Sequence, residues 1–352
     1  MIGSSAVNEA RIGYLRVKDF LNTPASASKS LTSLGFAAST NPGGIFPLNP
    51  GIEGIPEMDF ESFDIGVPSR VLSVIENTYQ AADNFSLQVG KHSFKAGEAY
   101  HFTEVTEELN NVVNGYYFFD QTLETGVDFA DFLIVAPGAF EQGEAPAADT
   151  RSYYFGLFGQ DSWHPTSNLT LNYGLRWDVI SPWWEKHNEL EVLKLGEQSV
   201  KFPNSPQGWV FPGDPGIPRT VAPVRHNNFG PRVGLAWSPS TDSGLLHALL
   251  GGGGKSSIRA GYGMFYTAFE GGYDFSVIGD APYGYFYENN GPSFANPYQT
   301  RATGAYNLNP FPYSFPPTNV SASNPDSNVP SSAFGVIGTS PTILGRSAPT
   351  QR

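Results

Sequence analysis

The stretch from Ser152 to Ile180 alternates apolar and polar residues over a length that constrains the fold more than any other part of the chain. In its second half, Leu169 to Val179, every odd-numbered residue is aliphatic or aromatic, and every even-numbered residue is polar or glycine. A period of two predicts a β-strand with one apolar and one polar face. Strands in soluble proteins usually have about five or six residues, whereas a tilted strand needs roughly nine to eleven to cross a bilayer. The length therefore favours a membrane strand.

The first half of this stretch, Ser152 to Trp163, alternates less regularly, and the polar turn His164–Asn168 separates the two halves. The pattern predicts a hairpin with Trp163 and Trp177 toward the strand ends, where aromatic rings suit the headgroup level of a membrane. A soluble β-sandwich also alternates, but it needs a second sheet with closely spaced hairpins. Short and very long connections follow one another here, which is typical of outer-membrane barrels.

Further strands are expected wherever the same alternation recurs. The expected segments are Asn8–Lys18, a hairpin over Asn77–Phe102 that turns at Gly90-Lys91, Gly115–Asp120, Phe229–Ser238, Ser256–Thr267 and Tyr283–Tyr287. Asp83 and Glu98 interrupt the apolar side of the 77–102 hairpin, so we expect Glu98 to lie near a membrane interface or the register to shift there. Val127–Val135 is expected to form a short helix or a buried turn.

The remaining segments are rich in Ser, Pro, Gly and Asn and are expected to connect the strands. Asn22–Asp59 is expected to be a surface loop, and Ser181–Asn228 is long enough to suggest either a function or disorder. We assign residues 1–320 to a partial barrel domain and residues 321–352 to a Ser/Pro/Asn-rich, poorly ordered tail.

Composition supports an all-β protein and excludes several function classes. Aromatic residues make up 14% of the chain and charged residues only 15%, with 39 Gly and 29 Pro. The net charge of −13 argues against nucleic acid as a partner, because no basic patch is available to neutralise phosphates. Cysteine is absent, which excludes disulfides and thiolate metal sites. No apolar run is long enough for a transmembrane helix, and no secretory signal follows Met1, so we expect the chain to be a fragment.

The sequence gives no case for an enzyme, a cofactor or a bound metal. Gly251-Gly-Gly-Gly-Lys255-Ser256 lacks the first glycine of the phosphate-loop motif, and a strand pattern rather than a helix follows it. The six histidines show no metal-ligand spacing. Glu270, Asp274 and Asp280 are read as a solvated loop face rather than as a cation site. No nucleophile elbow is present.

Several ordered motifs resemble one family. The segments are FGLFGQDSWHPTSNLTLNYGLRWD (155–178), NNFGPRVG (227–234), KSSIRAGYGMFY (255–266), the hairpin 84–100 and FADFL (129–133). Together they resemble the barrel strands of TonB-dependent outer-membrane receptors of the Oar-like type. The family-motif positions in this chain are Asp161, Trp163, Arg176, Asn228, Arg232, Arg259 and Tyr262. Ser162 stands where the family usually has a second acidic residue.

The resemblance implies a chain in the outer membrane of a Gram-negative-type bacterium that takes up or exports a bulky substrate. Its partners would be outer-membrane lipid, the unknown substrate and the TonB energy-coupling complex, reached only through a plug. The plug and the family's closing strand are not recognised in the chain, which implies a middle section of the barrel.

The expected fold is therefore all-β: a section of a large antiparallel transmembrane β-barrel with long extracellular loops, open or incomplete in this chain. Gly90-Lys91, His164–Asn168 and Ser240–Lys255 are predicted to be periplasmic, and segments 181–228 and 268–300 extracellular. The alternative is a soluble β-rich binding or adhesion module, carbohydrate-binding through the aromatic residues that loop 181–228 is expected to expose.

Overall fold

The computed structural model describes most of the 352-residue chain. Left outside the description are residues 1–4, 22–28, 68–69, 121–123, 145–146, 221, 240–242, 252–254, 268–281, 306–310, 312–315, 317–319 and 328–352. Glu270, Asp274, Asp280 and almost all of the predicted tail lie outside the described residues.

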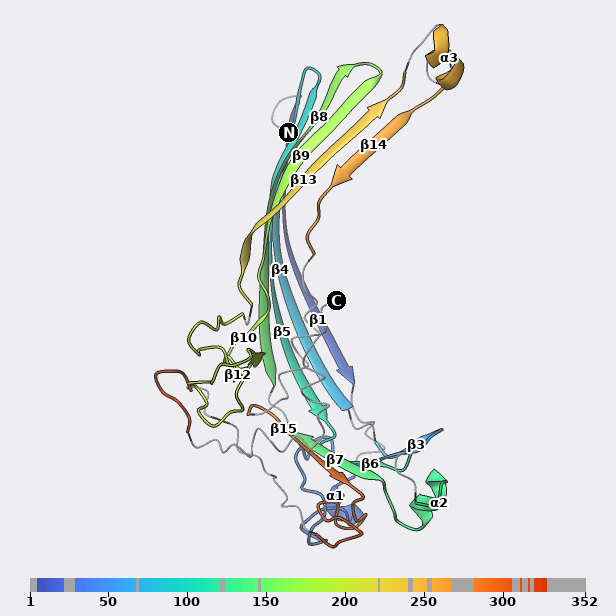
Figure 1. Cartoon of the computed structure of the whole chain (residues 1–352), viewed down its shortest axis with the longest axis vertical. Coiled ribbons are helices and arrows are strands. Elements are labelled where there is room, and N and C mark those ends of the chain that lie inside the picture. Colours follow the sequence, from blue (N-terminus) through green and yellow to red (C-terminus); the bar gives the residue numbers. More distant parts are fainter. Residues whose placement is uncertain are drawn as a thin grey trace.

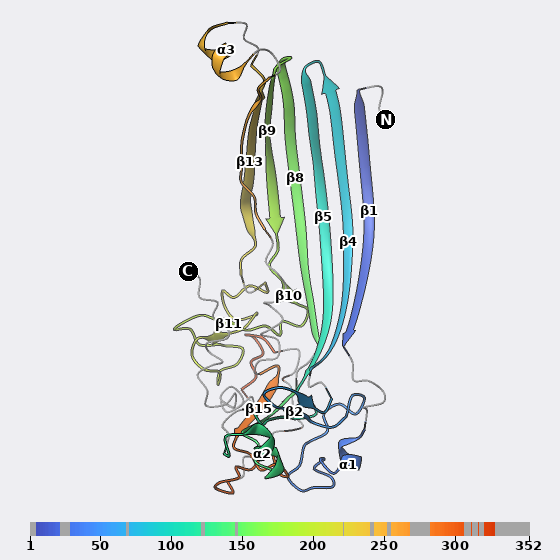
Figure 2. The ribbon, with the colours of Figure 1, turned by 90° about the vertical axis from the view of Figure 1, so that its right-hand side faces the viewer.

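One large antiparallel sheet runs along most of the molecule (Figures 1 and 2). Its path follows β1-β4-β5-β8-β9-β13-β14, and β10 pairs with the outer end of β8. The strands are β1 (Ala6–Leu21), β4 (Arg70–Val89), β5 (His92–Asn111), β8 (Ala148–Thr166), β9 (Leu169–Ile180), β10 (Trp184–Glu185), β13 (Arg225–Trp237) and β14 (Ile258–Gly263). The strands predicted over 8–18, 77–102, 152–180, 229–238 and 256–267 are confirmed in this sheet, but β4, β5 and β8 extend well beyond the alternating segments. The strand predicted over 115–120 belongs to the smaller sheet described below.

Short and long connections lie at opposite ends of this sheet. Gly90-Lys91 and the turn after Thr166 join strands at one end, and Gly90 adopts a φ of 56°, which suits glycine in a tight turn. Helix α3 (Gly244–Leu250) lies at the same end, between β13 and β14 (Figure 1). The connections after β1, β5 and β9 gather at the other end, as the predicted topology requires.

A second, smaller sheet lies at the end with the long connections. Its order is β15-β7-β6-β2-β3, and its strands are β2 (Glu57–Asp59), β3 (Asp64–Ile65), β6 (Tyr116–Phe118), β7 (Ala139–Glu144) and β15 (Tyr285–Asn290). Strands β2 and β6 run parallel, whereas the other pairs are antiparallel. The predicted strand at 283–287 is thus present as β15, but it belongs to this small sheet. Helices α1 (Leu31–Leu34) and α2 (Asp128–Leu133) lie at the same end of the molecule as this small sheet.

The prediction of a surface loop over Asn22–Asp59 is wrong for its described part. Leu31, Ala37 and Ile45 are completely buried in an aromatic core with Tyr117, Phe119 and Phe140. The Glu53 carboxylate accepts a hydrogen bond from the Leu31 backbone N–H at 2.7 Å, which helps to hold α1 in place. Few apolar residues are needed here because aromatic side chains from later segments supply the rest of the core. We call this part, together with the small sheet, the loop module.

The long segment Ser181–Asn228 is also folded rather than structureless. It contains β10, β11 (Val192–Leu193) and β12 (Trp209–Val210), the last two paired with each other. Phe202, Trp209 and Phe211 form a second apolar cluster with Tyr283. The described start of the tail also packs here, because the Asp326 N–H donates to the Lys201 carbonyl at 3.0 Å.

Candidate functional site: the two faces of the large sheet

The strand register collects the apolar residues of neighbouring strands on one face of the large sheet, which we call the apolar face. Tyr173 of β9 lies opposite Val233 of β13, and Leu157 of β8 lies opposite Trp177. Apolar side chains on this face are exposed: the exposed fraction is 50% for Leu175 and 56% for Val233. An apolar surface of this extent is not stable against water and needs an apolar environment.

Aromatic rings border the apolar face at both ends. Near the short turns, His92 stacks on Phe94 and on Trp163, with ring centroids 5.4 and 5.6 Å apart. Farther along the strands, Tyr14, Tyr79, Phe102 and Tyr153 occupy one continuous row across four strands. On β5 the two borders are ten residues apart, from His92 to Phe102. At about 3.3 Å per residue and a tilt of about 40° this is roughly 25 Å of depth, the usual height of the apolar band on a transmembrane barrel.

Charged residues begin directly beyond the second aromatic row. Arg151 Nε lies 3.0 Å from the Glu104 carboxylate, one alternation step after Tyr153 and Phe102. In the next row Asp149 accepts a hydrogen bond from Thr106 at 2.6 Å and lies 3.4 Å from Lys186 Nζ. The apolar face therefore ends abruptly in a polar layer, and the outer parts of β4, β5 and β8 continue into it.

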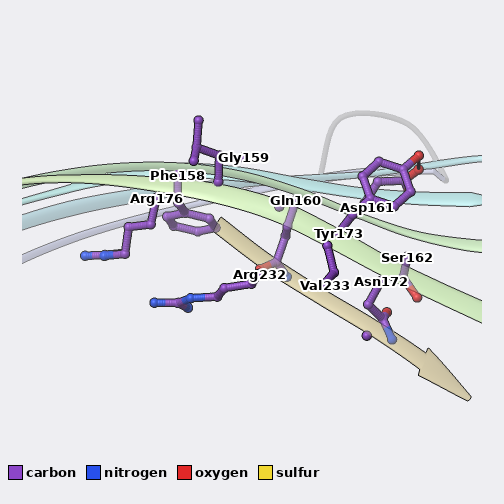
Figure 3. Close-up of a pocket in the computed structure, with 13 residues that line it drawn as sticks. Phe158, Gly159, Gln160, Asp161, Ser162, Asn172, Tyr173, Arg176, Arg232 and Val233 are labelled. Atoms are coloured by element: carbon purple, nitrogen blue, oxygen red, sulfur yellow. Dashed lines mark hydrogen bonds between the residues drawn. The ribbon is translucent and has the colours of Figure 1, made fainter. Parts of the chain in front are cut away.

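The opposite, polar face carries a hollow of about 320 Å³ over β8, β9 and β13 (Figure 3). Its lining on that face includes Phe158, Gln160, Asn172, Arg176 and Arg232. In Figure 3 the side chains of Arg176, Arg232 and Gln160 extend from the same side of the ribbons. Two guanidinium groups beside amide side chains form a surface that can bind carboxylate or phosphate oxygens through several hydrogen bonds.

Arg176 is held in position by a hydrogen-bonded group on the polar face. Its Nε lies 2.9 Å from the Asp178 carboxylate, its terminal nitrogen donates to the Tyr154 hydroxyl, and that hydroxyl donates to Asp178 at 2.5 Å. Gly156 makes this possible: a Cβ there would lie 2.3 Å from the Tyr154 hydroxyl oxygen and 2.7 Å from an Arg176 nitrogen. The guanidinium also lies 5.8 Å from the centre of the Phe158 ring.

A second polar group interrupts the apolar face near the short turns. The carboxylate of Asp161 is almost completely buried, and one of its oxygens accepts hydrogen bonds from the Tyr173 hydroxyl at 2.6 Å and pairs with His92 Nδ1 at 2.7 Å. His92 is itself stacked between Phe94 and Trp163. This arrangement links β5, β8 and β9 at the aromatic border.

A family model described as an outer membrane beta barrel domain matches residues 1–342. The chain belongs to this family. No curated protein and no solved structure gives a significant match. Family membership places the chain in the outer membrane, and the predicted fold class, a mostly β chain with a large antiparallel sheet that is not closed, is confirmed. The alternative of a soluble adhesion module does not agree with this location.

In an outer membrane beta barrel domain the apolar face is the lipid-facing side and the polar face the inner wall. The two aromatic borders then lie at the two membrane interfaces. No helix among the described residues is long and apolar enough to span a membrane.

The structure brings three of the seven family-motif residues together. Asp161, Arg176 and Arg232 all line the hollow. Only the side chains of Arg176 and Arg232 lie on its polar face, whereas the Asp161 carboxylate points to the apolar face, toward His92 and Tyr173. Arg232 Cζ also lies 4.5 Å from the centre of the Phe265 ring. Trp163 belongs to the aromatic border described above.

The remaining three motif residues lie apart from this hollow. Asn228 lies opposite Asp178, Arg259 opposite Ala236 and Tyr262 opposite Val233. The seven positions therefore do not form one binding site in the described part of the chain, and their role as a site remains a prediction.

The expectation for Glu98 is wrong in both of its forms. The β4–β5 register continues without a shift, and Glu98 lies directly opposite Asp83, about midway between the two aromatic borders. Both carboxylates border a hollow on the apolar face beside the small residues Ala96 and Gly159, and Asn8 donates a hydrogen bond to Asp83 at 2.8 Å. The two interruptions noticed in the sequence are therefore one polar spot, as the register of a hairpin that turns at Gly90-Lys91 requires.

Sequence reasoning missed Tyr154, Asp178 and His92. Asp178 could have been found, because it shares a parity with Arg176 two residues earlier. Tyr154 and His92 required the register between strands, for which the sequence holds no local signal. The aromatic residues of loop 181–228 are also not exposed as expected: Trp209 is buried, and Trp184 packs on Phe102 and Tyr153.

A buried lysine lies in the long segment outside the membrane strands. Lys201 Nζ donates to the Tyr283 hydroxyl oxygen at 2.6 Å and to the Asn188 carbonyl at 3.1 Å. Burial lowers the pKa of Lys201 to about 8, although the carboxylates of Asp214 and Glu189 nearby act in the opposite direction. Within the described ranges no group of three or more His, Cys, Asp or Glu side chains is arranged to hold a metal ion.

Proposed function

We propose that this chain forms part of a TonB-dependent transporter that moves a bulky substrate across the outer membrane. The motifs that resemble Oar-like receptors fall, in order, on β4–β5, α2, β8–β9, β13 and β14. The chain belongs to an outer membrane beta barrel family, which agrees with a transporter in that membrane. The observation that carries the proposal is the length of the strands together with the folded loop module at their ends.

Strands of this length are more than a membrane crossing requires. β4 and β5 each have 20 residues, whereas roughly nine to eleven are enough to span the bilayer. Their outer parts lead into a loop module with a buried aromatic core. A rigid wall and a folded module beyond the membrane create a space for capturing a large ligand before it enters the lumen, which a narrow diffusion pore would not need.

The inner wall offers groups that can contact a plug or a passing substrate. Arg176 and Arg232 lie on the polar face, and Arg176 is held by Asp178 and Tyr154. Fixed guanidinium groups favour a partner with carboxylate or phosphate groups. Coupling to TonB would take place through a plug domain packed against this wall.

The test is uptake by cells that carry the full-length gene. Candidate bulky ligands are labelled, and their accumulation is compared in cells with TonB, in cells without TonB and in cells treated with a protonophore. Accumulation that needs both TonB and the proton gradient supports the proposal. Entry at the same rate in all three conditions would identify a passive pore instead.

A further inference from the structure

Exposed apolar side chains belong to α2 and its ends and to the β2–β3 turn. In Figure 1, α2 and β3 lie at one corner of the loop module. We call this group the apolar tip; its members are Phe63, Val127, Phe129, Leu133, Ile134 and Val135. Helix α2 is inverted relative to an ordinary amphipathic helix. Its buried residue is Asp131, at 1% exposure, whereas Leu133 is 68% exposed.

Local hydrogen bonds enforce this inversion. Asp131 accepts hydrogen bonds from the backbone N–H groups of Glu124 and Thr125 at 2.7 and 2.9 Å, and from the Thr125 hydroxyl. These contacts hold the pKa of Asp131 below its ordinary value despite burial, which raises it. Because Asp131 is bound inward, Phe129 and Leu133 face outward, whereas Phe132 packs on Phe60 and Phe119 of the aromatic core.

The apolar tip is rigid before anything binds to it. Phe63 stacks on the buried Phe60 with ring centroids 4.6 Å apart, and Phe129 packs on Phe132 at 5.8 Å. Asp128 accepts a hydrogen bond from the Glu61 backbone N–H at 2.9 Å, which ties α2 to the β2–β3 turn. A preorganised apolar surface loses little conformational entropy when a partner covers it.

Val135 adds a backbone observation that points in the same direction. It adopts a φ of 55° just after the end of α2, where proteins usually place glycine. A β-branched residue at positive φ is strained, and such strain tends to persist where a side chain is needed for function. Glycine would relieve this strain, whereas Val135 adds an exposed isopropyl group to the apolar tip.

The surroundings of the apolar tip are acidic. Residues 54–69 contain four Asp or Glu and residues 112–147 contain six, with no Lys, Arg or His in either segment. The pKa of Asp64 is raised by its hydrogen bond with Asp59, by burial and by neighbouring carboxylates, and that of Asp120 is raised by burial and by Asp59. Arg301 pairs with Glu124, but Asp59, Asp64 and Asp120 repel one another, and a cationic partner would relieve that repulsion.

We propose that the apolar tip docks a segment of a partner protein in which apolar anchor residues are flanked by Lys or Arg. The apolar side chains would supply the contact area, and the acidic rim would select against neutral or acidic segments. This inference goes beyond transport and does not depend on it, because it concerns the surface of the loop module rather than the lumen.

The test uses the full-length protein in nanodiscs and three fluorescent peptides of equal length. One alternates Lys with Leu and Phe, one has Glu in place of Lys, and one has Ser in place of Leu and Phe. We expect the first peptide to bind at least tenfold more tightly than the other two. Leu133→Ser should weaken that binding about tenfold, whereas Leu195→Ser, which changes an even more exposed leucine in another loop, should leave it unchanged.

Val135→Gly separates docking from folding. This variant should raise the unfolding temperature, because it removes the strained residue, and at the same time weaken the binding of the basic peptide. Equal binding to wild type and Leu133→Ser overturns the proposal, as does equal binding of the acidic peptide. Self-association or vesicle attachment that Leu133→Ser abolishes, without peptide binding, would show that a second copy or a lipid surface covers the tip and would also overturn it.

Discussion

Replacing Leu175 by Arg should destabilise the barrel domain far more than replacing Leu171 by Arg. Both residues lie on the apolar face of β9, but at different depths. Leu171 is in the register row of Trp163 and His92 at the aromatic border, whereas Leu175 is in the row of Gly159 and Ala96, near the centre of the band. The four residues between them span about 13 Å along the strand, or roughly 10 Å of depth at a tilt of about 40°.

The expected costs follow from that difference in depth. An arginine near the bilayer midplane of a barrel costs about 2–4 kcal/mol, and one near the interface about 0–1 kcal/mol. Leu175→Arg should fall in the first range and Leu171→Arg in the second. Asn172→Arg, on the polar inner face, should change the free energy of unfolding by less than about 0.5 kcal/mol, as exposed substitutions usually do.

The measurement is reversible guanidinium unfolding of the full-length protein in lipid vesicles, followed by tryptophan fluorescence. A soluble β-sandwich would bury both leucines in its core and would penalise both substitutions alike. Equal costs for Leu171→Arg and Leu175→Arg would therefore refute the membrane placement. A large cost for Asn172→Arg would refute the assignment of the two faces.

Three further predictions concern single residues. Gly156→Ala should cost about 1–3 kcal/mol in the same unfolding assay, because the added methyl group displaces Arg176. An unchanged stability would mean that Arg176, Asp178 and Tyr154 are loosely held on the inner wall. Glu98→Leu should raise the stability of the domain in vesicles, since it removes a carboxylate beside Asp83 from the lipid-facing side; a loss of stability would mean that the spot binds something polar. In the folded state Lys201 has a pKa of about 8, so between about pH 8 and the ordinary pKa of lysine the folded state binds fewer protons than the unfolded state. The residues packed around Lys201 should therefore gain protection from hydrogen exchange as pH rises from about 8 to about 10. A Lys201→Met control should show no such gain.

The sequence by itself determined the strands and their faces. Alternation is a local property, because successive side chains of a strand point to opposite sides, and it was enough to place β8–β9, β13 and the 90–91 turn. The motif residues on these strands were also found from sequence, because their positions within short segments are local. Strand ends were less certain, since the outer parts of β4 and β5 continue past the apolar band, where the alternating pattern stops.

Tertiary structure alone decided which rows of side chains meet. The contact of Tyr154 with Arg176 and the joining of β15 to β7 depend on the register between strands and on contacts between segments that are distant along the chain. The burial of Leu31 and Ile45 depends in the same way on aromatic rings supplied by other segments. No short stretch of sequence encodes such contacts, because their free energy arises only when the loops have closed and the partners are packed together.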